Sequence, residues 1–115
     1  MEIRIATVQF ASLGHTSRLA IFRQLVQAGS DGLNVSAIAE RLNLAPATLS
    51  FHLANLNRAG LVKSRQESRF IYYSVDFDSI DGLLSFLTEN CCQGQACLPN
   101  TSETLSAMKC KPIIK

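Results

Sequence analysis

The chain has 115 residues, of which 17% are charged, and its formal net charge is only +2. This length indicates one domain, and the small net charge argues against a protein that binds polyanions without selectivity. No apolar run reaches the roughly 18 residues that suggest a membrane-spanning helix, and the N-terminus lacks the pattern of a signal peptide. We therefore expect a cytoplasmic protein with no membrane partner.

Two amphipathic helices are expected first, over residues 3–13 and 16–28. In the first helix, Ala6, Phe10 and Leu13 fall on one stripe at helical spacing. In the second helix, the apolar residues that we expect to face the core are Leu19, Phe22, Leu25 and Val26. A loop with two glycines then separates this pair of helices from the rest of the chain.

A helix-turn-helix is expected over residues 35–58. The first helix, VSAIAERLN, can be capped by Asn34 or Ser36, and a tight turn follows it. The second helix begins near Pro46, whose missing N–H costs nothing in a first turn, and Gly60 ends it. Its inner stripe consists of Leu49, Leu53 and Leu56 at i, i+4 and i+7.

The opposite face of the second helix carries no acidic residue and mostly small or hydroxyl-bearing side chains. Such a face can lie close in a major groove and donate hydrogen bonds to base edges and phosphates. An ordinary helical hairpin with a plain surface is the alternative interpretation. The residues that we predict to contact DNA from this helix are Ala47, Thr48, Ser50, Phe51, Asn55 and Arg58.

A two-stranded wing is expected next. Residues 61–65 predict a short strand, residues 66–68 a polar tip, and residues 69–75 an aromatic and β-branched return strand. Arg65 and Arg69 bracket the tip and are predicted to contact DNA, where they can bind phosphate or enter a minor groove. The two tyrosines of the return strand are expected to pack against the helices. The predicted fold class is therefore mainly α with a two-stranded β wing, a winged helix-turn-helix.

A last amphipathic helix is expected over residues 78–90. Together with the helix over residues 3–13, it carries more apolar side chains than one small core can cover, which predicts an α-helical dimer interface. We expect the domain to span residues 1–97. Residues 98–115, with two prolines and several polar side chains, are expected to form a loose tail.

The run LAPATLSFHLANLNRAGLVKSRQESRFIYYSV, residues 44–75, resembles the ArsR–SmtB family of winged-helix metalloregulators. Proteins of that family carry a pattern similar to L-x-x-S-H-L-x-x-L-x-x-A-G-L-V, followed by a basic hairpin that ends in Y-Y. The upstream segment LGHTSRLAIF resembles the start of the family's second helix, with Arg18 at its arginine. The resemblance implies a homodimeric repressor whose partner is double-stranded operator DNA.

The sequence departs from the family pattern in three ways. Phe51 stands where the family often has a polar residue, which implies a different base preference. Ser68 stands where the hairpin often has glycine, and His15 with Thr16 replaces an Asp-Pro pair.

A second predicted site is a cluster of cysteines just past the last helix. Cys91, Cys92 and Cys97 occur in the run CCQGQAC, and Gly94 gives the backbone the freedom to bring the three sulfurs together. Clustered cysteines in a cytosolic protein favour metal binding or redox chemistry over structural disulfides. Three thiolates without a histidine or carboxylate partner suit a soft ion, such as arsenic(III) or antimony(III), whereas zinc prefers four ligands. Cys110, which has a lysine on each side, is a possible additional ligand or a bystander.

The predicted function is a repressor that arsenite or antimonite releases from its operator, with no organic cofactor. Three alternatives stay open, which are sensing of another soft metal, thiol redox or persulfide sensing, and a thiol-dependent enzyme. The enzyme is the least favoured of them, because the sequence offers no phosphate-cradling loop and no general base near the cysteines. We therefore expect a protein without enzymatic activity.

Overall fold

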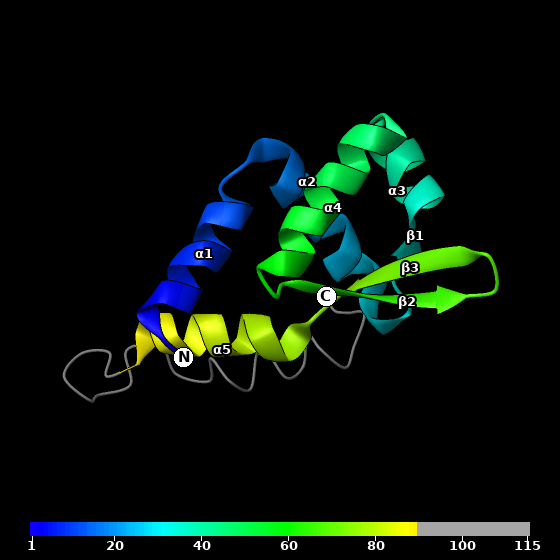
Figure 1. Cartoon of the computed structure of the whole chain (residues 1–115). Coiled ribbons are helices and arrows are strands. Elements are labelled where there is room, and N and C mark those ends of the chain that lie inside the picture. Colours follow the sequence, from blue (N-terminus) through cyan, green and yellow to red (C-terminus); the bar gives the residue numbers. More distant parts are fainter. Residues whose placement is uncertain (90–115) are drawn as a thin grey trace.

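The computed structural model describes residues 1–89, which form a helical body from which a β-hairpin projects (Figure 1). The elements in chain order are α1 (Ile3–Leu13), α2 (Thr16–Ala28), the 3-10 helix η1 (Gly29–Asp31), β1 (Leu33–Asn34), α3 (Val35–Leu42), α4 (Pro46–Arg58), β2 (Val62–Glu67), β3 (Phe70–Val75) and α5 (Phe77–Thr88). The predicted fold class, a mainly α winged helix-turn-helix, is confirmed.

The predicted two-stranded wing is present as β2 and β3, and a third strand, β1, extends its sheet. β1 joins the hairpin antiparallel to β3, in the order β1-β3-β2, and pairs Leu33 with Tyr73 and Asn34 with Tyr72. A strand of two residues is too short to produce a visible alternation in the sequence. Gly32 permits the pairing, because its φ is +73° and an added Cβ would lie 2.2 Å from the carbonyl oxygen of Tyr73.

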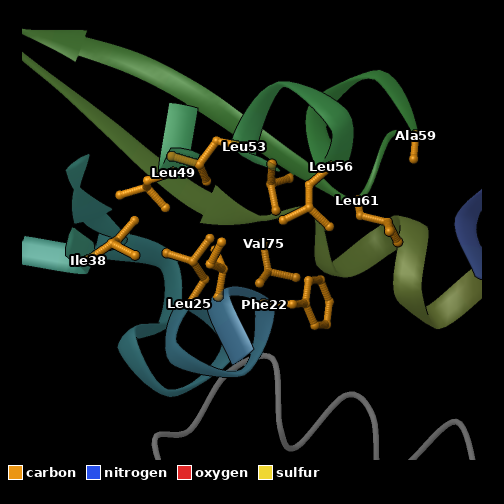
Figure 2. Close-up of a cluster of buried hydrophobic side chains, with 11 residues drawn as sticks. Phe22, Leu25, Ile38, Leu49, Leu53, Leu56, Ala59, Leu61 and Val75 are labelled. Atoms are coloured by element: carbon orange, nitrogen blue, oxygen red, sulfur yellow. The ribbon is translucent and has the colours of Figure 1, made fainter. Parts of the chain in front are cut away.

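The hydrophobic core lies between α2, α3, α4 and the base of the sheet. Leu49, Leu53 and Leu56 are all fully buried, which confirms the predicted inner stripe of α4. Figure 2 shows these leucines pointing toward Leu25, Ile38 and Val75 from three other elements. The close packing of this cluster fixes the orientation of α4 about its own axis, and so decides which of its residues face outward.

One prediction of an inward-facing residue, that of Leu19, is wrong. Leu19 is 45% exposed, and Ile21, fully buried, takes the expected place in the core. α2 carries two apolar stripes, and spacing alone does not say which of them the core selects. In α1 the buried residues are Ala6, Gln9 and Ser12, while Phe10 is 42% exposed.

Side chains cap three of the helices. The Asn34 side chain accepts a hydrogen bond from the N–H of Ala37 at 2.8 Å, so Asn34 and not Ser36 caps α3. His15 stands at the family's aspartate position and caps α2, because its Nδ1 accepts from the N–H of Ser17 at 3.1 Å. Asp76 caps α5 in the same manner. Each cap satisfies a backbone donor that a helix start leaves unpaired.

Candidate nucleic-acid interface

α4 presents its predicted outer face to solvent. Ala47, Thr48, Ser50, Phe51 and Arg58 are all exposed. No acidic side chain lies within α4, and Arg58 is the basic residue of its last turn. The face is therefore small, hydroxylated and weakly basic, apart from the one large side chain of Phe51.

Asn55 differs from the other predicted contact residues of α4. It is only partly exposed, and its Oδ1 accepts a hydrogen bond of 2.6 Å from the hydroxyl of Ser12 in α1. Ser12 itself is buried, so the bond ties α4 to the helix behind it. The Oδ1 atom of Asn55 therefore helps to position α4, and only the rest of this side chain can contact a ligand.

The hairpin of β2 and β3 places two arginines near its tip. Arg65 pairs across the strands with Tyr72, and its guanidinium carbon lies 5.0 Å from the centre of that ring. Arg69 is exposed in the turn itself, beside Ser68, whose φ is +60°. That conformation explains why glycine often occupies the position of Ser68 in the family pattern. Glu67 and Phe70 are paired across the two strands, so the turn consists of Ser68 and Arg69.

The two tyrosines of β3 have different surroundings. Tyr73 packs against the hydrophobic core, as predicted. Tyr72 is half-buried and lies beneath the Arg65 guanidinium, so it supports the wing arginine.

Positive charge gathers around α4 and the wing. Arg58, Lys63 and Arg69 are exposed, and within residues 1–89 none of them forms an ion pair. Arg65 lies 3.5 Å from Glu67, an exposed contact that water and salt screen strongly. α4 and the wing therefore both carry exposed basic side chains on a chain whose net charge is small.

A buried polar cluster behind α4 was not predicted. His52 is 6% exposed, and its Nδ1 lies 3.3 Å from an amino group of Arg18. The Nε of Arg18 donates to the backbone oxygen of Ser12 at 2.7 Å, and the His15 ring lies 4.8 Å from that of His52. Burial lowers the pKa of His52, and the nearby His15 and Arg18 lower it further. A neutral His52 therefore joins α4 to the start of α2.

Gln9 forms a second link that the sequence pattern did not reveal. Its side chain is 2% exposed, and its Nε2 donates to the Ala59 oxygen at 3.0 Å and to the Ser79 hydroxyl at 2.9 Å. One amide therefore connects α1 with the end of α4 and with α5. A polar residue at a buried position of an amphipathic helix is the signal that could have identified it.

Comparisons with known proteins agree with this geometry. Residues 13–65 match the model of a helix-turn-helix domain. The HTH-type transcriptional regulator YceK of Bacillus subtilis is 36% identical over 75 residues, which cover 65% of this chain and 74% of YceK. The chain belongs to the HTH-type transcriptional regulators. It is accordingly a DNA-binding regulator of transcription and not an enzyme.

Solved structures give the same architecture. The structure of HlyU from Vibrio cholerae matches with a TM-score of 0.62 and 31% identity, over 81% of this chain and 100% of HlyU. An ArsR-like transcriptional regulator from Rhodococcus matches with a TM-score of 0.69 over 92% of this chain and 91% of the regulator, at 24% identity. The second match supports the fold alone.

The regulator also exposes large apolar side chains on α1 and α5. We call this set the terminal-helix surface, and its members are Met1, Ile3, Ile5, Val8, Phe10 and Leu87. The N-terminal end of α1 lies near α5 in Figure 1, and the Met1 side chain comes within 3.4 Å of the place where a Cβ on Gly82 would lie. Ile5, Val8 and Arg58 also line a shallow pocket of about 370 Å³.

The predicted cysteine site lies outside the described residues. Cys91, Cys92, Cys97 and Cys110 all follow the last described residue of the regulator, Glu89. Among residues 1–89, no three histidine, cysteine, aspartate or glutamate side chains gather in a way that could hold a metal ion. In the same range, no helix has both the length and the apolar character needed to cross a membrane.

Proposed function

We propose that the regulator is a homodimeric repressor of the ArsR–SmtB type that binds an inverted-repeat operator. The observation that carries the proposal is the exposed, acid-free outer face of α4, accompanied by Arg58, Lys63 and Arg69, which form no ion pair within residues 1–89. A helix of this kind fits a major groove, and the wing arginines neutralise backbone phosphates. Two such helices related by a two-fold axis would enter successive grooves about 34–36 Å apart.

The homodimer is proposed from the terminal-helix surface. Ile3 and Leu87 are 70% and 61% exposed, and four further apolar side chains accompany them. Large apolar side chains exposed on both terminal helices of one small domain favour a protein–protein interface there. A second copy of the chain would cover it isologously, with the same residues contributed by both subunits.

Arsenite or antimonite is the proposed inducer, bound as a thiolate complex by Cys91, Cys92 and Cys97. The support is the chemistry of three clustered thiols that follow α5 closely in the chain. Gln9 offers a path for the signal, since it bonds Ser79 of α5 and the Ala59 oxygen at the end of α4. Release from DNA requires that the inducer prefer one dimer geometry, typically by about 1–3 kcal/mol.

The deciding experiment measures binding to a selected operator duplex by fluorescence anisotropy while arsenite, cadmium, zinc or peroxide is added in parallel. We expect arsenite to release the parent protein, and Ser replacements at Cys91, Cys92 or Cys97 to abolish release while operator binding persists. Cys110→Ser is the matched control and should respond like the parent. A Cys92→Ser protein that still responds to arsenite would exclude the three-sulfur site.

Two other results would redirect the proposal. Release by peroxide but not by arsenite would make the protein a thiol redox or persulfide sensor. Release by cadmium alone would point to another soft metal. Binding that is independent of salt and of sequence would contradict the DNA-binding surface itself.

A further inference from the structure

Phe51 is the one large apolar side chain that α4 exposes. It is 62% exposed at the middle of the outer face, and its neighbours one turn away are the exposed alanines Ala47 and Ala54. Since these neighbours carry only methyl groups, the phenyl ring stands above the surface around it. Leaving an aromatic ring in water forgoes the free energy of its burial, so a role in binding would account for its position.

The Phe51 ring packs against a buried side chain of the same helix. It meets the buried His52 ring edge-on, with 5.5 Å between the ring centres and 65° between their planes. His52 is in turn held by Arg18 at 3.3 Å, and the leucines on either side of it in α4 are fully buried. Phe51 is therefore presented from a rigid helix backed by a packed polar cluster.

The surroundings of Phe51 favour duplex DNA over a protein as its partner. Thr48 and Ser50 supply hydroxyls beside the ring, and Arg58 lies further along the same exposed face. α4 contains no carboxylate that would repel phosphate. The terminal-helix surface, which is the larger apolar region, belongs to other helices.

We infer that Phe51 contacts the C5-methyl group of a thymine in the major groove and so determines part of the operator sequence. This inference rests on the proposed DNA-binding role of α4. The thymine methyl is the apolar group that a base pair offers in that groove, whereas the other base edges offer hydrogen-bond donors and acceptors. A phenyl ring cannot use those donors and acceptors, and it would leave them unsatisfied if it covered them. Phe51 should therefore select for thymine against cytosine at one position of each half-site.

The test begins with sites selected by the parent protein from a library of random duplexes. Each thymine of a selected half-site is then replaced by deoxyuridine, which removes only the methyl group. Affinity is measured by fluorescence anisotropy at fixed salt. We expect one replacement to weaken binding of the parent about three- to fivefold, the scale for one buried methyl group. Phe51→Ala should bind the thymine and deoxyuridine duplexes equally, while the matched variant Asn57→Ala, at an exposed residue of α4 outside the predicted DNA contacts, should keep the difference.

Phe51→Leu, which keeps an apolar side chain, should retain part of the discrimination and guards against a folding artefact in Phe51→Ala. The inference is overturned if no deoxyuridine replacement weakens the parent, or if Phe51→Ala still discriminates. It is also overturned if Phe51→Ala dissociates the dimer in sedimentation, because the ring would then face a second copy. Failure to enrich any sequence would instead defeat the proposed function, and the inference with it.

Discussion

Replacing Leu87 by glutamate should convert the proposed dimer of the regulator to monomers. Leu87 lies near the end of α5 and is 61% exposed in the single chain. Full burial of a leucine side chain stabilises by about 1.5–3 kcal/mol, so covering the exposed fraction would contribute about 1–2 kcal/mol per subunit. A two-fold interface contains the residue twice, which makes the apolar loss about 2–4 kcal/mol, or roughly 30- to 1000-fold in the dimer dissociation constant. Burying an unpaired carboxylate adds a further cost of several kcal/mol.

Sedimentation equilibrium over a range of protein concentrations measures this change directly. Phe70→Glu is the matched control, because Phe70 is 47% exposed but lies on the wing, away from α1 and α5. The control should remain dimeric. If Leu87→Glu keeps a dissociation constant within about threefold of the parent, the subunit interface does not include the end of α5, and the assignment of the terminal-helix surface is wrong.

Three further predictions test the wing, the sheet and the cluster behind α4. Arg69→Ala should weaken binding to operator and random DNA alike and reduce the slope of log affinity against log salt by about one; losses confined to the operator would contradict a phosphate contact. Gly32→Ala should lower the free energy of unfolding in urea by at least about 1–3 kcal/mol, because its φ of +73° disfavours a side chain and the new Cβ would meet the Tyr73 oxygen at 2.2 Å; a change below about 0.5 kcal/mol would refute the pairing of β1 with β3. The pKa of His52 is lowered below its ordinary value of 6.5, so the stability that depends on its neutral form should be complete above pH 6.5 and should be lost as the pH falls below that value. Melting temperatures of the parent and of His52→Gln, plotted against pH, should therefore diverge below pH 6.5. Parallel plots for the two proteins would refute the assignment.

The helix-turn-helix could be predicted because its signals are local. The spacing of Leu49, Leu53 and Leu56 defines a buried stripe, and the same spacing defines the opposite outer face. Asn34 and Pro46 mark helix starts for reasons that need no tertiary structure. These elements appear in the structure where the sequence places them.

The contacts between the helices could not be predicted in this way. The choice of Ile21 over Leu19 for the core depends on how α2 meets its neighbours, and both residues are apolar. The bonds of Gln9 and Ser12 join residues 43 to 70 positions apart. The periodicity of a sequence shows which residues share one face of a helix or strand. It does not show which other element packs against that face.

Because fully buried leucines hold α4 in place, duplicated copies of a gene for this chain could diverge at the outer residues of α4 and acquire new operators while keeping the fold. Substitutions at exposed positions usually change the free energy of unfolding by less than about 0.5 kcal/mol. Ala47, Ser50 and Phe51 can therefore be replaced without loss of the fold. Asn55 is not, because its bond to Ser12 joins it to α1. Paralogues should therefore vary at the first three positions and change Asn55 only together with Ser12.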